Sequence, residues 1–246
     1  MSSLRTLVFF ATPAHSCSYL PDRDATTMFV DPRARVDKRL YSQLTALGFR
    51  RSGSHYYRPH CEHCNACVPV RLDARAFRPD RSQRRVWKRN QDVSFRLVPA
   101  QFTERYYQLY AHYINERHAD GDMYPPSRDQ FQSFLVEGAT DSWFLEMSLG
   151  DKLVGLAVVD ILEDGLSAIY TVFHPDHDDR SLGTLAILWQ VKEARVRGLP
   201  WVYLGYWISE SRKMNYKTRF RPIEALLDGT WQAFSPDTGD REDPAR

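Results

Sequence analysis

The feature that most constrains the fold is an ordered alternation of strand-like and helix-like segments between residues 93 and 208. Two hairpin dipeptides flanked by apolar runs, Gly150-Asp151 and Asp164-Gly165, divide residues 142–175 into three consecutive strands. The other segments are a strand over 93–99, helices over 103–118, 127–137 and 182–198, and a buried strand over 200–208. A strand meander followed by a helix and a further strand predicts a mixed α/β (α+β) domain.

This order of elements is that of an N-acetyltransferase-like (GNAT-like) acyltransferase domain. Such domains hold the pyrophosphate of coenzyme A on backbone amides at a helix N-terminus, through a basic-x-x-Gly-x-Gly/Ala loop. Here the corresponding turn, 180–184, reads RSLGT, so a threonine replaces the second small residue. The turn therefore does not support coenzyme A as donor, and an acyl group carried on another anion, such as aminoacyl-tRNA, suits it better. Alternatively, Gly183 only lets the loop enter the helix.

Residues 1–92 are predicted to form an irregular, cysteine-containing and basic domain in front of the acyltransferase-like domain, residues 93–234. Its expected elements are a strand over 6–11, a helix over 35–49, a strand over 67–73 and a short basic helix over 80–91. The polar end of the chain, residues 235–246, reads as a disordered tail. No run approaches the roughly 18 apolar residues that span a bilayer, so we expect a cytoplasmic protein without membrane contact.

Four cysteines form the most conspicuous motif. Three of them, Cys61, Cys64 and Cys67, follow a two-residue spacing in HCEHCNACVPVRL, and Cys17 lies 44 residues before the first. In a cytoplasmic protein such residues are thiols or metal ligands rather than disulfides. Four thiolates could bind Zn²⁺ or an iron–sulfur cluster. The alternative is that they are buried thiols that pack the irregular domain without a metal.

Two basic stretches point to an anionic partner. The helix predicted from RSQRRVWKRN carries Arg81, Arg84, Arg85, Lys88 and Arg89. A charged face of one sign favours phosphate binding, since A-form RNA is held mainly through its backbone and 2′-hydroxyls; a merely solvated face is the alternative. The second stretch, RKMNYKTRFRP, follows the buried strand and offers further candidate binding residues. These are Lys213, Tyr216, Lys217 and Arg219, together with Arg180 of the RSLGT turn.

Five segments together resemble the aminoacyl-tRNA–protein transferases. They are CSYLPDRDATTMFVDP, YYRPHCEHCNACVPVRLD, RSQRRVWKRNQD, SLGTLAILWQVKEA and YLGYWISESRKMNYKTRFRPIEAL, and the resemblance extends over roughly residues 9–234. It is greatest to the short bacterial aspartate/glutamate leucyltransferases, which are relatives of eukaryotic arginyltransferases. The resemblance implies transfer of leucine from Leu-tRNA to the N-terminal Asp or Glu of proteins, which marks them for degradation by the N-end rule pathway.

Three other functions stay open at this point. The nearest is arginyl transfer from Arg-tRNA. The others are an acyl-coenzyme A-dependent N-acyltransferase, against which the RSLGT turn argues, and a non-catalytic RNA-binding zinc module, which would leave the apolar core without a purpose.

Aminoacyl transfer asks for little chemistry. The enzyme must align an amine with an aminoacyl ester, stabilise an oxyanion and return a proton to the tRNA hydroxyl, so neither a cofactor nor a cysteine nucleophile is required. Asp160, an acid in the apolar strand LAVVDIL, could anchor or deprotonate the amine, or cap a turn near Glu163. His174, which follows the strand AIYTVF, is a candidate proton carrier or a structural loop histidine. Tyr206 could line the cleft or belong to the core.

Overall fold

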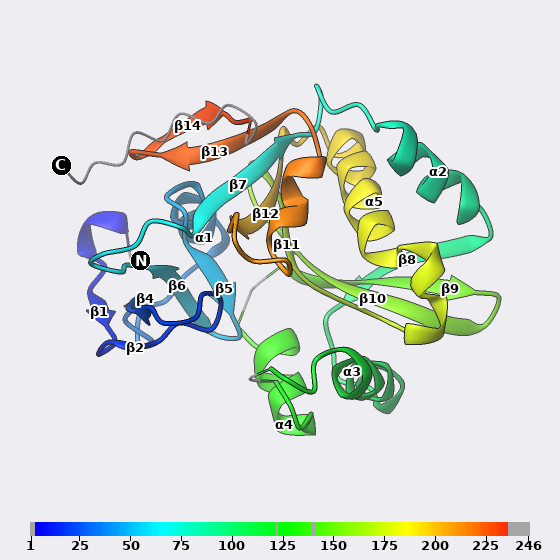
Figure 1. Ribbon diagram of the computed structural model, residues 1–246, viewed down its shortest axis with the longest axis horizontal. Coiled ribbons are helices and arrows are strands. Elements are labelled where there is room, and N and C mark those ends of the chain that lie inside the picture. The colour runs from blue at the N-terminus through cyan, green and yellow to red at the C-terminus, as the bar shows by residue number, and fades with distance from the viewer. Residues whose placement is uncertain (1–2, 122, 139–140, 236–246) are drawn as a thin grey trace.

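The computed structural model describes residues 3–121, 123–138 and 141–235, and its centre is an eight-stranded sheet (Figure 1). The strand order is β14-β13-β7-β12-β11-β10-β9-β8. The strands are β7 (Val68–Asp73), β8 (Val93–Pro99), β9 (Ser142–Leu149), β10 (Lys152–Ile161), β11 (Gly165–Phe173), β12 (Trp201–Trp207), β13 (Ile223–Leu227) and β14 (Thr230–Ala233). Neighbouring strands pair antiparallel, except that β11 and β12 are parallel.

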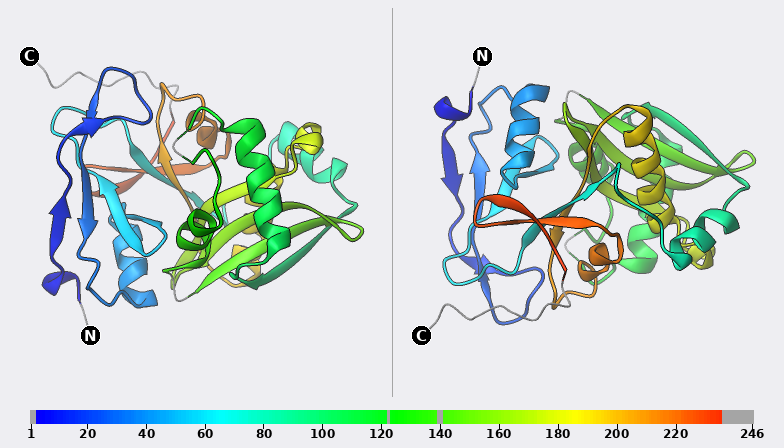
Figure 2. Two further views of the ribbon diagram at one scale, coloured as in Figure 1. Left: turned by 90° about the horizontal axis from the view of Figure 1, so that it is seen from below. Right: turned by 90° about the horizontal axis from the view of Figure 1, so that it is seen from above.

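Helices cover both faces of the sheet. The helices α2 (Arg81–Arg89) and α5 (Leu182–Val196) lie on one face, and α3 (Glu104–Arg117) and α4 (Arg128–Phe131) on the other (Figures 1 and 2). Strand β10 supplies both cores, because successive strand residues point to opposite faces. Ala157 and Val159 pack in the core that contains α5, whereas Leu156 and Val158 pack in the core that contains α3.

The N-terminal region is more regular than the sequence indicated. A four-stranded antiparallel sheet, in the order β1-β4-β6-β5, packs with helix α1. Its elements are β1 (Phe9–Ala11), β4 (Thr27–Val30), α1 (Lys38–Ala46), β5 (Arg50–Ser52) and β6 (His55–Pro59), and a separate ribbon joins β2 (His15–Ser16) to β3 (Asp24–Ala25). These strands have two to five residues each, too few to show a clear periodicity. The expectation of an irregular region was wrong for this reason.

Most elements expected after residue 66 are confirmed. β8 has the predicted bounds, and α3 and α5 fall within the predicted helices. The capping residue decides where α2 begins, because Asp80 accepts a hydrogen bond from the Gln83 amide (2.8 Å). The helix predicted over 127–137 is instead α4 followed by a π-helical turn, Gln132–Val136.

The division of the chain at residue 92 stays a prediction. Two elements that precede it, β7 and α2, pack with the large sheet, and β7 lies between β12 and β13. The predicted tail lies outside the described residues except for Ser235. None of the helices in the described segments has the length and apolar composition that crossing a membrane requires.

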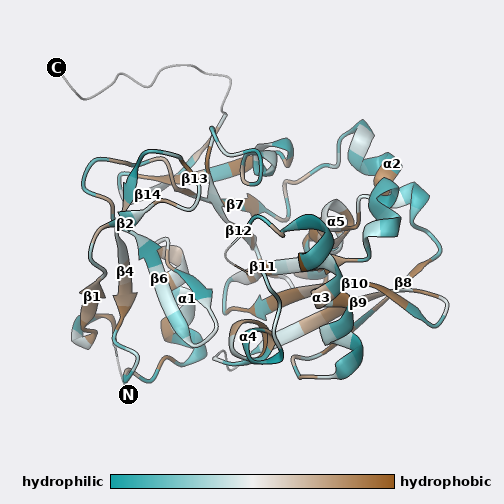
Figure 3. Ribbon diagram, turned by 60° about the horizontal axis from the view of Figure 1, so that its bottom comes forward, coloured by the Kyte–Doolittle hydropathy of each residue, from teal (hydrophilic) through white to brown (hydrophobic). Residues whose placement is uncertain are grey.

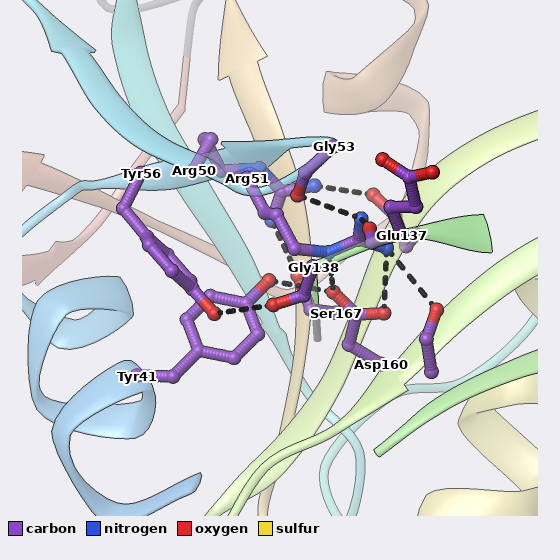
Figure 4. Close-up of polar contacts among 11 residues, drawn as sticks. Tyr41, Arg50, Arg51, Gly53, Tyr56, Glu137, Gly138, Asp160 and Ser167 are labelled. Carbon is purple, nitrogen blue, oxygen red and sulfur yellow. Dashed lines mark hydrogen bonds and ion pairs between the residues drawn. The ribbon is translucent and has the colours of Figure 1, made fainter. Parts of the chain in front are cut away.

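A buried ion pair joins the N-terminal sheet to the large sheet (Figure 4). The Arg51 guanidinium, from β5, donates from Nε and Nη2 to the two carboxylate oxygens of Asp160, on β10, at 2.7 and 3.0 Å. Neither side chain is more than 1% exposed. The Tyr41 hydroxyl of α1 donates to the same carboxylate at 2.7 Å, and burial raises the pKa of Tyr41 well above its usual value. Both charges are therefore compensated without water.

Backbone groups complete the surroundings of this arginine. Its Nη1 donates to the carbonyl oxygens of Gly53 and Glu137, each at 3.1 Å, and its Nη2 also donates to the Ser142 hydroxyl at 3.1 Å. A buried charge is tolerated only when it is paired and hydrogen-bonded in this way. The guanidinium consequently ties β5, the end of the π-helical turn and β9 to β10.

We predict that Arg51→Met lowers the free energy of unfolding by about 3–5 kcal/mol, because it leaves the Asp160 carboxylate buried without its cation. Chemical denaturation would measure the loss. Arg128→Met is the matched control, since the side chains of the Arg128–Glu104 ion pair are exposed (60% and 49%). The free energy of unfolding of this variant should stay close to that of wild type. Adding Asp160→Leu to Arg51→Met should recover part of the loss. Equal effects of the two arginine variants would contradict the prediction.

Candidate active site

The parallel ladder between β11 and β12 ends early. In the described residues its register runs only from Gly165 opposite Trp201 to Ser167 opposite Tyr203, whereas β11 continues to Phe173 and β12 to Trp207. Strand edges beyond a ladder present peptide groups that can bind an extended substrate. The end of this ladder is therefore the first candidate for a place where a polypeptide terminus or an acyl group enters the sheet.

A second buried arginine lies where the ladder ends. Arg50, the neighbour of Arg51 on β5, donates from Nη1 to the Ser167 hydroxyl at 2.8 Å and from Nη2 to the Ala168 carbonyl oxygen. Both acceptors belong to β11, and Ser167 faces Asp160 in the adjoining β10–β11 ladder. The guanidinium of Arg50 is thus a fixed positive charge between two sheets, at the point where β11 and β12 cease to pair.

Gly205 of β12 leaves room for this guanidinium. A Cβ atom at this position would lie 3.2 Å from Nε of Arg50, and the backbone φ of 78° is in the region that glycine favours. The register between β12 and β7 shifts at the same place, between Tyr203 and Gly205. The backbone conformation of β12 at Gly205 therefore makes room for the guanidinium of Arg50.

Lys217 is a second buried cation near Arg50. It belongs to a short 3₁₀ helix, η4 (Asn215–Arg219), is 4% exposed, and donates to the Tyr206 carbonyl oxygen at 2.6 Å. Burial, followed by the charge of Arg50, lowers the pKa of Lys217 to about 7. The guanidinium of Arg50, together with the protonated fraction of Lys217, creates a positive potential beside the unpaired part of β12.

Tyrosine side chains surround the same charge. Burial raises the pKa of Tyr57, Tyr206 and Tyr216, while the positive charge of Arg50 acts in the opposite direction on each of them. Tyr216 is the accessible member, at 37% exposure. Neutral phenols and a fixed guanidinium are groups that can donate hydrogen bonds to a developing oxyanion.

The three residues predicted to be catalytic do not form one cluster. Asp160 is fully engaged by Arg51 and Tyr41, which favours a structural role over contact with an amine. The Tyr206 hydroxyl donates to the Gly48 carbonyl oxygen at 2.8 Å, and its residue is buried beside Arg50. His174 follows β11 six residues after Ala168, about 20 Å along the strand, so it lies away from the end of the ladder.

The basic helix has the predicted location at the surface. All five of its cations are exposed, while Gln83 and Asn90 are buried on the opposite side. Figure 3 shows hydrophilic residues along most of α2. Arg89 donates to the Asp179 carbonyl oxygen and Arg84 to the Pro79 carbonyl oxygen, so two of the guanidinium groups also make local contacts.

The two basic stretches, distant in sequence, are adjacent in space. Gln83 of α2 donates from Nε2 to the Arg219 carbonyl oxygen at 3.0 Å, and Arg219 itself is exposed. Other predicted binding residues are placed differently: Arg180 pairs with Asp92 at 2.9 Å and Lys213 with Asp120 at 3.3 Å. Lys217 was predicted to contact acceptor-end phosphates or a substrate carboxylate, but its ammonium group is buried.

The four cysteines share one neighbourhood. Burial raises the pKa of Cys67 to about 12, and the other three thiols add to the rise. Two of the sulfur atoms contact hydrogen-bond donors. Sγ of Cys61 accepts from the backbone amide of Thr26 at 3.5 Å, and Sγ of Cys64 lies 3.5 Å from Nη1 of Arg23. Four thiolates are a donor set that suits Zn²⁺ or an iron–sulfur cluster. In the described residues, the potential ligands that lie within 4.8 Å of one another do not include the cysteines. To bind one metal centre, the four sulfur atoms would therefore have to move closer together.

Sequence reasoning missed Arg50 and Arg51. They stand in GFRRSGS, between a turn glycine and polar residues, where two adjacent arginines look like surface charge. The available signal was indirect, because an acid in an apolar strand, Asp160, requires a cation from elsewhere in the chain.

Comparison with known proteins identifies the family. Residues 15–85 match the family model described as "Arginine-tRNA-protein transferase, N terminus", and residues 105–227 match the one described as "Arginine-tRNA-protein transferase, C terminus". The chain belongs to this family of aminoacyl-tRNA–protein transferases.

Its similarity to named relatives extends over nearly the full chain. A protein of Marinobacter nauticus named aspartate/glutamate leucyltransferase is 76% identical over 237 residues, which are 96% of this chain and 100% of the relative. A protein of Hahella chejuensis with the same name is 56% identical, over 94% of this chain and 99% of the relative. Among solved structures, the C-terminal domain of a putative lysylphosphatidylglycerol synthetase from Agrobacterium fabrum gives a TM-score of 0.43 at 15% identity, covering 68% of this chain and 51% of that one.

We predict that Cys64→Ser removes about one metal centre per chain from anaerobically purified protein and lowers Tm, because metal-binding energy of this kind is also folding energy. Metal analysis and thermal unfolding would measure both effects. His63→Ala, at a neighbouring side chain that is 89% exposed, is the control and should change neither. Unaltered metal content and Tm in Cys64→Ser would leave the thiols as packing residues.

Proposed function

We propose that this protein transfers leucine from Leu-tRNA to the N-terminal Asp or Glu of other proteins and so marks them for degradation by the N-end rule pathway in the cytoplasm. The observation that carries the proposal is the 76% identity, over 96% of the chain, to a relative named for this activity. The family description supplies the aminoacyl-tRNA, and the buried cations beside β12 supply a place for negative charge.

In this proposal the reaction takes place where β11 and β12 stop pairing. The free α-amine of the protein substrate attacks the carbonyl carbon of the aminoacyl ester, and the resulting oxyanion is stabilised by the guanidinium of Arg50 and by nearby phenol groups. The bond to the tRNA oxygen then breaks, and the proton lost by the amine ends on the tRNA hydroxyl. Because the ester is already activated, no covalent enzyme intermediate is needed.

The energetic contribution of the protein is mainly alignment. An α-amino group has a pKa near 7.7–8.0, so a useful fraction is neutral at physiological pH without a strong base. Holding it against the ester converts a bimolecular encounter into a reaction within one complex. An arginine fixed by two acceptors on β11 needs no reorganisation when the oxyanion forms, which is the condition for effective electrostatic stabilisation.

The tRNA would bind across α2 and Arg219. Together they offer six exposed cations on adjoining elements, a number that suits contacts with the phosphate backbone. Two exposed carboxylates, Asp92 and Asp120, are already paired with Arg180 and Lys213 and so repel phosphate less than free acids would.

The family description names arginine, so arginyl transfer from Arg-tRNA is the second candidate. The charge of the site argues against it. A cationic aminoacyl side chain would have to approach the buried guanidinium of Arg50 at short range and low dielectric. An apolar leucyl side chain avoids this repulsion.

We predict that the purified protein moves radiolabelled leucine from Leu-tRNA to peptides that begin with Asp or Glu, and not to an Ala-initiated peptide. Arg-tRNA should label the same peptides at least about tenfold more slowly because of the charge repulsion. Peptide-bound label separated from tRNA is the measurement. Equal labelling of the Ala peptide, or transfer only from acyl-coenzyme A, would overturn the proposed function.

The same assay tests the site. Arg50→Gln keeps a hydrogen-bond donor but removes the charge, so transfer should fall by about 10²–10³-fold. Its melting temperature must be measured alongside, because Arg50 also joins β5 to β11. A stable variant with full activity would exclude the end of the β11–β12 ladder as the reaction site.

We predict that Arg84→Ala combined with Lys88→Ala weakens tRNA binding and reduces the slope of log K against log salt by up to about two, through the loss of two phosphate contacts. Arg128→Ala combined with Arg197→Ala is the control, as it removes two exposed cations that are paired with carboxylates. Filter binding over a range of salt concentrations measures both. An identical slope in the two double variants would mean that α2 is only solvated.

A further inference from the structure

Three potential metal ligands converge where α3 meets the end of β11. They are His112 on the exposed side of α3, His174 directly after β11, and Asp176 in the 3₁₀ helix η3 (Pro175–Arg180). One donor atom from each lies within 4.8 Å of the other two. The two imidazole rings are 4.8 Å apart between centroids and inclined by 31°. Side chains from three separate elements thus face a common point.

Hydrogen bonding does not account for this arrangement. In the described residues, Nδ1 of His174 is buried without a hydrogen-bond partner, and so is Nε2 of the neighbouring His177. Oδ2 of Asp176 lies 3.6 Å from His174 Nδ1, beyond hydrogen-bonding distance. A buried imidazole nitrogen without a partner is costly, and a metal ion is one group that satisfies it.

We propose that His112, His174 and Asp176 bind one divalent transition-metal ion of the Zn²⁺ class. Two imidazoles and a carboxylate are ligands that suit Zn²⁺, Co²⁺ or Ni²⁺, whereas Mg²⁺ and Ca²⁺ prefer oxygen ligands alone. Three protein ligands leave a position for water or for a further side chain. The site is separate from the cysteines, and it does not rest on the proposed transfer activity.

The required movement is small. Ligands about 2.1 Å from one tetrahedral ion are about 3.4 Å apart, so the donor atoms must approach by roughly an ångström. His112 and Asp176 are exposed and can change rotamer without disturbing the core. His174 is held by its backbone amide, which donates to the Val154 carbonyl oxygen at 2.8 Å.

Charges near the site are nearly balanced. Lys152 lies close enough to His174 to lower its pKa, after the larger effect of burial, and would oppose a cation. Asp178 of η3 is already paired with Arg117 of α3 at 2.8 Å. Asp176 therefore supplies the negative charge of the ligand set, and its replacement should weaken binding strongly.

The site would connect the helix α3 to η3. The far end of η3 is attached to the basic helix, since Arg89 of α2 donates to the Asp179 carbonyl oxygen, and Arg180 pairs with Asp92 in the loop that follows the helix. A bound ion would consequently hold in one position the segment that leads into α5 and adjoins α2.

Titration with Co²⁺ of the full chain tests the proposal, because cobalt bound to thiolates gives a charge-transfer absorption that imidazole and carboxylate ligands lack. We expect wild type to bind a Co²⁺ ion without that absorption and to melt at a higher temperature when loaded. His112→Ala and Asp176→Asn should each weaken this binding at least about tenfold. Both residues are exposed, so both variants should fold, which circular dichroism can check.

His118→Ala is the matched control. His118 caps the same helix, but its Nε2 lies 3.2 Å from the Tyr113 hydroxyl and it is outside the ligand group, so its replacement should leave binding unchanged. Equal Co²⁺ affinity in wild type and His112→Ala would overturn the proposal. So would a titration in which every bound Co²⁺ shows thiolate charge transfer.

Discussion

The burial of the Arg51 guanidinium is the constraint on which the relation between the two sheets depends. A fully enclosed cation must find a carboxylate and several further acceptors in the folded state. Asp160 on β10, the carbonyl oxygens of Gly53 and Glu137 and the Ser142 hydroxyl satisfy this requirement only when β5 docks in one position. Other placements of the N-terminal sheet would leave at least one charge buried alone.

The same docking positions the charge at the candidate active site. Arg50 is adjacent to Arg51 in the chain, so its location is set once Arg51 is paired. It then meets Ser167, which faces Asp160 across the β10–β11 ladder. In the proposed mechanism, stability and function are thus coupled through one dipeptide: Arg51 holds the sheets together, and Arg50 supplies a preorganised cation where β11 and β12 part.

The fold could be predicted from sequence where the signal is local. β8, α3 and α5 follow from periodicity and turn residues, and the capping box of Asp80 and Gln83 defines the start of α2. The short strands before residue 60 could not be predicted, because their stability comes from pairing with distant partners. Local patterns also fail to distinguish a buried charge from an exposed one, so Arg51 and Lys217 resembled surface residues.

The site was predicted only in part for a similar reason. The sequence marked Asp160 as an acid that needs an explanation, but its partner lies 109 residues away. The cations of α2 are exposed, as a binding face requires, because Gln83 and Asn90 occupy the buried side of the helix. The reaction class, aminoacyl transfer from tRNA, was identified from the resemblance to aminoacyl-tRNA–protein transferases. No single residue of the site would have indicated it.

The position of β7 has a consequence for how the chain reaches its folded state. β7 pairs with β12 and β13, so residues 68–73 can form their sheet hydrogen bonds only with strands that lie beyond residue 200. During synthesis on the ribosome, an early segment with alternating buried residues therefore stays without its neighbours until most of the chain has emerged. Such non-local pairing gives a high contact order, which slows folding. The late C-terminal hairpin, rather than the N-terminal sheet, completes the large sheet around β7.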